Sequence, residues 1–318
     1  MTSAPAEGIE GKGWRLIVGD CVEASRGIEA GTVDLSVFSP PFSNLYTYSD
    51  SMADMGNSLT NEEFFSHFGY LVPELYRVTR PGRLCVVHCK DLPRYQSRDG
   101  ASAIYDFPGE IVRLFESHGW WFHSRVTIWK DPVLEAAKTN SYGLLHKSFT
   151  DRSEVVRQGL PDYLCVFRKH EEDMTIGQVK QSRVPGDYVG TRGPAPGLAQ
   201  RDYSIQLWQR YASPVWFDIS QTRVLNVSVA REDKDEKHMC PLQLDVIARC
   251  IDLWTMPGDL VFSPFAGIGS EGYEALMRGR RFLGVELKRA YAEEAARNLA
   301  SVANQGGLFA SEEAVAHA

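Results

Sequence analysis

Short runs of hydrophobic residues alternate with segments of helical periodicity at both ends of the chain. We predict strands at residues 14–18, 33–38, 83–88, 121–129, 163–167, 260–262 and 281–285. Helices are predicted at residues 21–28, 104–118, 241–256 and 271–277, with a last helix ending near Val302 and a frayed tail from Asn304. Such alternation is typical of crossover units around a mostly parallel, covered sheet. The pattern therefore predicts an α/β fold.

The longest helix is predicted to begin near Thr60. Residues 60–63 read Thr-Asn-Glu-Glu, a capping-box pattern that marks the start of a helix. Apolar residues then follow at helical spacing; they are Phe64, Phe65, Phe68, Leu71, Leu75 and Val78. Pro81 and Gly82 are predicted to end this helix.

The alternation fails between about residues 170 and 235. Gly and Pro recur there, and three arginines are interspersed with aromatic residues: Arg192, Arg201 and Arg210 with Tyr188, Tyr203, Trp208 and Tyr211. We expect a separate loop-rich lobe. The chain is thereby divided into residues 1–169, 170–235 and 236–318.

The composition is that of an ordinary globular protein, with 43% hydrophobic and 24% charged residues among 318. No stretch approaches the roughly 20 apolar residues of a membrane span, and the N-terminus lacks the apolar core of a secretion signal. We therefore expect a cytoplasmic protein without a membrane partner. The net charge of −7 argues against a nucleic-acid binder that works by charge alone. Residues 124–169, however, hold eight Lys/Arg and five Asp/Glu, which is compatible with DNA binding.

The cysteines do not form a metal-binding pattern. There are six, at positions 21, 85, 89, 165, 240 and 250, and none has C-x-x-C spacing. Cys85 and His88 lie on a predicted strand and would point to opposite faces of it. We therefore expect no metal, and reduced thiols.

The strand at residues 33–38 ends in Ser39-Pro40-Pro41-Phe42. Neither proline can donate a backbone N–H, and each fixes its own φ angle, so the turn is rigid. It lies at the carboxyl edge of the predicted sheet, where open α/β folds bind ligands. A hydroxyl, free carbonyls and an aromatic face suit a planar base that carries an amino group. On these four residues alone, an ordinary Pro-Pro loop remains an equal alternative.

A second strand-to-helix turn lies far downstream. It reads Ser263-Pro264-Phe265-Ala266-Gly267-Ile268-Gly269-Ser270, and its glycines let the backbone approach a ligand closely. Glu286 ends the next strand, about 20 residues on, where an acidic side chain can accept both hydroxyls of a ribose. The chain has no phosphate-binding loop of the G-x-x-x-x-G-K-[ST] type. The pattern favours a nucleoside-containing ligand over a triphosphate.

With both turns in place, the chain resembles the DNA methyltransferases that modify amino groups with S-adenosylmethionine. It is similar to the permuted (β) class, in which the catalytic motif precedes the cofactor motif. Residues 39–42 match the family's [DSN]-P-P-[YF] motif, and residues 263–269 match its D-P-F-x-G-x-G turn. Residues 74–83 resemble the helix-to-strand stretch that usually reads E-x-x-R-V-L-K-P-G-G.

The resemblance implies a Rossmann-like methyltransferase sheet in permuted order, with S-adenosylmethionine and DNA as partners. It assigns the amino-group grip to Ser39, Pro40, Pro41 and Phe42. It assigns cofactor binding to Ser263, Pro264, Phe265, Ala266, Gly267, Gly269 and Ser270, with Glu286 on the ribose, Asp20 near the adenine and His238 near the methionine end. Residues 170–235 would recognise the target sequence, with packing of their Arg and Tyr side chains against the catalytic domain as an equal alternative. Residues 130–157, with Lys138, Asn140, Lys147 and Arg152, would lie near the phosphates.

Two positions depart from the commonest family pattern. Ser263 stands where Asp is usual, so the carboxylate near the methionine ammonium group is missing. Ser39 also stands where Asp is frequent, and in this family Ser goes mainly with cytosine-N4 enzymes. We therefore expect methylation of a flipped-out cytosine at N4, with Phe42 stacked on the base. No covalent nucleophile is needed, and Cys240 is expected either to pack in the interior or to line the cofactor site.

Three alternatives stay open at this point. The first is adenine-N6 methylation by the same machinery. A more distant one is methylation of an RNA base or an amide, and the long insertion between the two motifs favours DNA instead. The third is a degenerate methyltransferase kept as a DNA-binding or regulatory protein. A homodimer is a further open possibility.

Overall fold

The computed structural model describes residues 8–42, 54–94, 100, 103–139, 159–171, 200–226 and 241–316, with backbone only at 136–139, 200–204 and 304–316. The strands are β1 (Gly8–Gly11), β2 (Trp14–Val18), β3 (Val33–Phe38), β4 (Thr79–Lys90), β5 (Leu92–Arg94), β6 (Ala103–Tyr105), β7 (Trp120–Ile128), β8 (Asp162–Lys169), β9 (Val215–Trp216), β10 (Leu260–Ser263) and β11 (Arg281–Glu286). The helices are α1 (Cys21–Arg26), η2 (Met55–Asn57), α2 (Asn61–Val78), α4 (Phe107–Ser117), α5 (Pro132–Thr139), α8 (Gln200–Tyr211), α9 (Leu244–Trp254), α10 (Ser270–Met277) and α11 (Arg289–Ala316).

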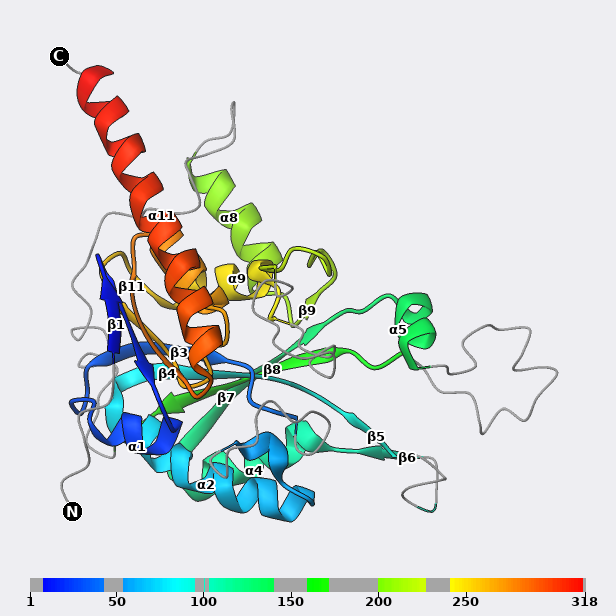
Figure 1. The fold of residues 1–318 in the computed structure, drawn as a ribbon. Coiled ribbons are helices and arrows are strands. Elements are labelled where there is room, and N and C mark those ends of the chain that lie inside the picture. The colour runs from blue at the N-terminus through cyan, green and yellow to red at the C-terminus, as the bar shows by residue number, and fades with distance from the viewer. Residues whose placement is uncertain are drawn as a thin grey trace, which may run out of the picture.

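One sheet of nine strands forms the centre of the molecule, in the order β1-β2-β11-β10-β3-β4-β8-β7-β9 (Figure 1). Its five middle strands, from β2 to β4, are parallel, while β1 and β8 join them antiparallel. The predicted mostly parallel α/β sheet is thus confirmed. The small pair β5–β6 stands apart from it.

The direction of winding reverses between β3 and β10. The chain leaves β3 through α2 to reach β4 on one side, and leaves β10 through α10 to reach β11 on the other. Neighbouring strands that wind in opposite directions form a topological switch point, and the crevice at their carboxyl ends is the usual ligand site of open α/β sheets. Both turns singled out in the sequence follow these two strands.

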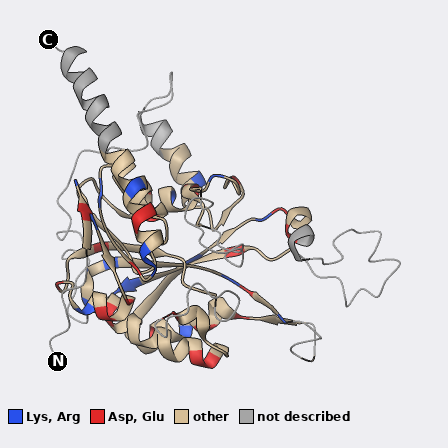
Figure 2. Cartoon of the chain, viewed as in Figure 1, with Lys and Arg blue, Asp and Glu red and all other residues tan. Residues whose placement is uncertain are grey.

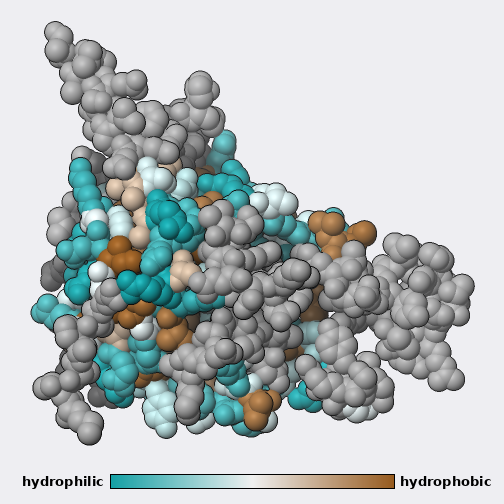
Figure 3. All heavy atoms as spheres, viewed as in Figure 1, coloured by the Kyte–Doolittle hydropathy of each residue, from teal (hydrophilic) through white to brown (hydrophobic). Residues whose placement is uncertain are grey.

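Helices cover both faces of the sheet (Figure 1). On one face the cluster of buried residues draws its helical members from α1, α2 and α4, and on the other face mainly from α9, α10 and α11. Phenylalanines dominate the first cluster; among them are Phe64, Phe68, Phe107 and Phe115. Where described residues are visible in Figure 3, the outer surface is largely hydrophilic with scattered apolar groups. The result is a three-layer arrangement that holds the strand ends rigidly.

The beginning of α2 agrees with the capping-box prediction, but its end does not. Thr60 accepts a hydrogen bond from the Glu63 N–H at 3.1 Å. The helix stops at Val78, and Pro81 and Gly82 lie inside β4. Gly82 has a φ of 77°, and the pairing of β3 with β4 shifts register here. A bulge therefore absorbs the two residues that were expected to end the helix.

Two further predicted boundaries were wrong. The helix expected from Ile104 starts at Phe107, because Asp106 caps it by accepting from the Gly109 N–H, and residues 103–105 pair with β5 instead. At the other end of the chain, α11 continues to Ala316 beyond the predicted fraying at Asn304. Leu, Ala and Glu prevail after residue 307, and these are strong helix formers.

Part of the segment at residues 170–235 is continuous with the sheet. Val215 and Trp216 form β9, which pairs with the edge of β7. Trp216 is buried in the second core cluster, and its indole N–H donates to the carbonyl of Tyr211 at the end of α8. Residues 211–225 therefore pack as an extension of the sheet's far edge. The segment is not wholly a separate lobe.

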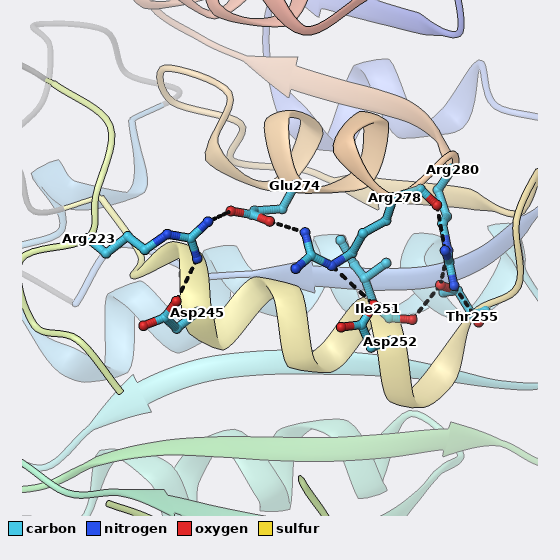
Figure 4. A network of polar contacts seen from close by, with 8 residues as sticks. All are labelled: Arg223, Asp245, Ile251, Asp252, Thr255, Glu274, Arg278 and Arg280. Atoms are coloured by element: carbon cyan, nitrogen blue, oxygen red, sulfur yellow. Dashed lines mark hydrogen bonds and ion pairs between the residues drawn. The ribbon is translucent and has the colours of Figure 1, made fainter. Parts of the chain in front are cut away.

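A network of ion pairs joins α9, α10 and the loop before α9 (Figure 4). Its centre is Glu274 on α10, which is fully buried and binds Arg223 at 2.9 Å and also Arg278. Arg223 also binds Asp245, and Arg278 binds Asp252 at 3.1 Å. A carboxylate at the centre of such a network balances two cations in a low-dielectric environment.

We expect Glu274→Ala to lower the free energy of unfolding by about 2 kcal/mol, because it leaves two partly buried guanidinium groups without their shared carboxylate. Urea denaturation followed by circular dichroism measures this change. Glu293→Ala is the matched control, since Glu293 forms an exposed pair with Arg289 on α11 and should cost at most about 0.5 kcal/mol. Equal losses in the two variants would contradict a central role for Glu274.

Within the described ranges, no helix has both the length and the apolar character needed to cross a membrane.

Candidate active site

The carboxyl ends of five parallel strands meet at one edge of the sheet and carry most of the residues predicted to be functional. Asp20 lies two residues after β2, and Glu286 ends β11. Ser263 ends β10, and Ser39 directly follows β3. The amide of Gly19 donates to the carbonyl of Glu286 at 2.9 Å, which joins the first two ends. Of the predicted site residues, only His238 lies outside the described part of the chain.

The turn after β3 is anchored by its prolines and lined by aromatic rings. Pro40 and Pro41 are buried, whereas Ser39 and Phe42 are partly exposed. The Phe42 ring meets the Phe107 ring edge-on, with centroids 6.2 Å apart. Buried prolines fix the backbone, so the hydroxyl of Ser39 and the ring of Phe42 are presented in one arrangement.

Aromatic contacts join the turn after β10 to the end of β3. The ring of Phe265, in the turn after β10, lies 5.7 Å from the ring of Phe38 at the end of β3. The ring of Phe265 also lies 6.4 Å from the ring of Phe68 on α2. Residues 39–42 and 263–270, more than 200 positions apart in sequence, therefore form adjacent walls of one site.

His88 lies beside Ser39. It is near the end of β4, and its Nδ1 is 3.0 Å from the Ser39 Oγ. Its Nε2 is 3.1 Å from a carboxylate oxygen of Asp162 at the start of β8. Lys130 contacts that same oxygen at 2.6 Å. The result is a chain of polar contacts from Ser39 through His88 and Asp162 to Lys130.

Asp162 is ionised in this arrangement. Burial by itself would raise its pKa, but hydrogen bonding and charge from His88 and Lys130 outweigh burial and hold that pKa well below its ordinary value. A buried carboxylate with two such partners is therefore ionised at neutral pH.

Sequence reasoning missed this chain of contacts, because it considered His88 only as a metal ligand. A signal was present for His88 alone: β3 and β4 pair in parallel, with Phe38 opposite Val87, so the next residues, Ser39 and His88, are neighbours. Asp162 and Lys130 reach the site through β8 and β7. Both strands were predicted, but their antiparallel pairing has no local sequence signature.

The turn after β10 has the shape of a binding loop. Gly267 and Gly269 have φ values of 53° and 87°, which favour glycine. The carboxylate of Glu286 accepts from the Gly267 N–H at 2.8 Å and from the Lys288 N–H at 2.9 Å. The glycine turn and Glu286 are therefore in direct contact.

Two features of this loop suit a nucleoside ligand with a polar, charged end. The Ser263 Oγ is buried and has no hydrogen-bond partner among the described residues. A Cβ atom at Gly267 would meet no heavy atom within 4 Å, so the loop is open on that side. An unpaired buried hydroxyl is costly unless a ligand group satisfies it.

Three acids near this loop differ in their surroundings. Burial raises the pKa of Glu286 to about 7. Burial raises the pKa of Glu271, at the first turn of α10, to about 8. Asp20, in contrast, accepts from the N–H groups of Val22 and Glu23 and so caps α1. Glu286 therefore changes charge near neutral pH, and this change would alter its hydrogen bonds to a ligand hydroxyl.

Cys85 and His88 have separate surroundings. Cys85 is buried in the first core cluster, while His88 contacts Ser39 and Asp162. Across the described residues, no three His, Cys, Asp or Glu side chains gather in a way that could hold a metal ion.

Comparison with known proteins identifies the family. The family model of N6/N4 DNA methylases matches residues 33–297. The orphan methyltransferase M.BamHII of Bacillus amyloliquefaciens is 22% identical over 285 residues, covering 87% of this chain and 88% of that protein. The structure of TTHA0409 from Thermus thermophilus superposes with a TM-score of 0.59 at 21% identity, covering 90% of this chain and 94% of that one. The cytosine-N4-specific PvuII DNA methyltransferase gives a TM-score of 0.54 at 15% identity, covering 92% of each chain.

The chain therefore belongs to the N6/N4 family of DNA methylases. It is an S-adenosylmethionine-dependent DNA methyltransferase that acts on an exocyclic amino group, at N4 of cytosine or N6 of adenine.

Proposed function

We propose that this methyltransferase modifies N4 of cytosine. One observation carries the proposal. Ser39, the residue proposed to contact the base, directly follows β3, and its Oγ lies 3.0 Å from the Nδ1 of His88. Ser in this position goes mainly with cytosine-N4 enzymes in the family that the sequence resembles. The fold is shared with the PvuII methyltransferase, which is specific for cytosine N4.

The residues of the catalytic turn would act as a grip on the amino group. The target base would be flipped out of the duplex, since its amino group cannot be reached inside the stack. Phe42 would stack on the base, a contact that contributes about 1–3 kcal/mol. The Ser39 hydroxyl and the Pro40 carbonyl would accept hydrogen bonds from the amino group and expose the nitrogen lone pair. The buried prolines hold both acceptors in place.

The loop from Ser263 to Ser270 would hold S-adenosylmethionine, which when bound supplies a methyl group already activated by a sulfonium centre. Glu286 would accept from the ribose hydroxyls, and the open side of Gly267 would admit the ligand close to the backbone. Ser263 would give its unpaired hydroxyl to the methionine end. Asp20 near the adenine and His238 near the methionine end complete the proposed site.

The recognition of a target sequence is proposed for residues 170–235. Two of the arginines in this segment already have acidic partners: Arg210 binds Asp218, and Arg223 binds Asp245. In the view of Figure 2, the Lys/Arg and Asp/Glu positions along the described ribbons are intermixed. The proposal therefore places base readout on other residues of the segment, and phosphate contacts on residues 130–157, most of which lie outside the described ranges.

Identification of the methylated nucleoside shows which base is the target. We expect that DNA incubated with the enzyme and methyl-labelled S-adenosylmethionine, then digested to nucleosides, contains labelled N4-methyldeoxycytidine by mass spectrometry. Labelled N6-methyldeoxyadenosine would refute the cytosine assignment. A protein that binds DNA but shows no heat of binding with S-adenosylmethionine would point instead to a degenerate, regulatory relative.

A further inference from the structure

His88, Asp162 and Lys130 form a buried relay behind Ser39. His88 and Asp162 are each 6% exposed, and the Lys130 side chain is 8% exposed. Asp162 is brought there by the antiparallel strand β8, on which it pairs with Lys90 of β4 and Ile128 of β7. Lys130 follows β7 by two residues. Charges that are buried away from water interact strongly. The charges of Asp162 and Lys130 therefore influence which atoms of His88 and Ser39 carry protons.

The ionised carboxylate of Asp162 fixes the tautomer of His88. Its oxygen lies 3.1 Å from the Nε2. The contact is electrostatic and lacks hydrogen-bond geometry, but a negative charge this close favours the neutral imidazole that carries its proton on Nε2. The Nδ1 is then a bare acceptor, 3.0 Å from the Ser39 Oγ. Ser39 must therefore donate its proton to His88. The lone pairs of its oxygen remain for the substrate.

The direction of the hydrogen bond between Ser39 and His88 matters because a hydroxyl, unlike a carboxylate, can either donate or accept. If His88 is protonated, Nδ1 becomes a donor and the Ser39 hydroxyl turns its proton toward the base. An amino group that is to be methylated needs a hydrogen-bond acceptor at Ser39, since its N–H groups would point at the Ser39 oxygen. The neutral form of His88 supports the reaction, and the imidazolium form opposes its start.

We infer that His88, held by Asp162, makes Ser39 an acceptor toward the amino group and takes up the proton that this group releases. The inference rests on the proposed function, in which Ser39 grips the amino nitrogen. His88 acts through Ser39 and is therefore a positioning residue. The relay supplies the base that is missing when Ser replaces Asp.

The step balances without a further reactant. A bond forms between the amino nitrogen and the methyl carbon, while the carbon–sulfur bond breaks and its electron pair stays on sulfur. The methylated nitrogen is then positive, and it loses one proton to the Ser39 Oγ as the hydroxyl proton of Ser39 passes to the His88 Nδ1. The imidazolium is stabilised by the carboxylate of Asp162 and gives its proton to solvent after the product leaves.

The groups that face His88 come from each neighbouring element. Ser39 and the ring of Phe42 lie on the side of the catalytic turn, with the Phe42 centroid at 6.1 Å. Asp162 of β8 faces the other ring nitrogen, and Lys130 follows behind it. The Lys130 ammonium contacts the same oxygen of Asp162 that faces the imidazole, so the two groups share its negative charge.

The test measures kcat against pH at saturating S-adenosylmethionine and DNA. Wild type should lose activity on the acid side. In His88→Asn the amide oxygen can still accept from Ser39 but cannot take a proton, so kcat should fall about 10²-fold and its acid limb should disappear. Asp162→Asn should move the acid limb to lower pH, because the imidazolium loses its charged partner. His67→Asn, on the exposed face of α2, is the control and should match wild type.

A second readout does not depend on activity. Nitrogen-15 NMR of histidine-labelled wild-type protein should show the neutral His88 ring with its proton on Nε2. A proton on Nδ1, or a His88→Asn variant with wild-type kcat and an unchanged acid limb, would overturn the inference. If the variant does not fold, the NMR measurement decides. Failure of the site assignment itself looks different, because Ser39→Ala would then remain active.

Discussion

Ser39→Ala should lower the rate of methyl transfer about 10³-fold while leaving the affinity for S-adenosylmethionine within about twofold of wild type. The substitution removes the acceptor that faces the amino group and cuts its contact with His88, and the loss of one such group in an active site typically costs this much. It leaves the backbone intact, since Pro40 and Pro41 hold the turn. Single-turnover kinetics with labelled cofactor, together with calorimetric titration of the cofactor, measure the two quantities separately.

The matched control is Ser36→Ala on the same strand. Ser36 is fully buried, and its hydroxyl has no partner among the described residues. Its removal should therefore leave turnover unchanged and stability equal or slightly higher. If Ser39→Ala turned over as fast as Ser36→Ala, the catalytic role of residues 39–42 would have to be abandoned.

The parts of the site that depend on short-range geometry could be predicted from the sequence. Ser39-Pro40-Pro41-Phe42 and the glycine turn each follow a recognisable buried strand, and the order of elements places both turns at the sheet edge where β3 and β10 meet. The spacing of turn and strand also placed Glu286 at the same edge, although its contact with the Gly267 N–H was not predicted. These features rest on the turn chemistry of a few neighbouring residues.

The parts that depend on long-range pairing could not be predicted. Asp162 reaches His88 because β8 inserts antiparallel between β4 and β7, and nothing near Asp162 in the sequence signals that register. The pairing of Val215 and Trp216 with β7 could not be predicted either, since a two-residue strand has no periodicity in the sequence. Pro81 and Gly82 misled for a different reason: they resemble a helix end, but a bulge in β4 accommodates them.

Glu286→Gln should weaken the binding of S-adenosylmethionine about 10²- to 10³-fold. A carboxylate at the end of β11 is the proposed acceptor for both ribose hydroxyls, and hydrogen bonds to a charged group contribute about 1.5–3 kcal/mol each. The amide can accept with only one oxygen and carries no charge. Calorimetric titration at pH 8 measures the loss, with Glu293→Gln on the exposed face of α11 as the control.

The pH dependence of binding provides the sharper criterion. Burial raises the pKa of Glu286 to about 7, above the ordinary 4.5, so the side chain is mostly protonated at pH 6 and mostly ionised at pH 8. The ligand prefers the ionised form, and binding should therefore be about tenfold weaker at pH 6 than at pH 8, with release of a proton on binding at the lower pH. Glu286→Gln should abolish both the pH dependence and the proton release. Wild-type affinity that does not vary with pH would exclude Glu286 as the ribose acceptor. A group that changes charge in this range and binds the ligand must make the affinity depend on pH.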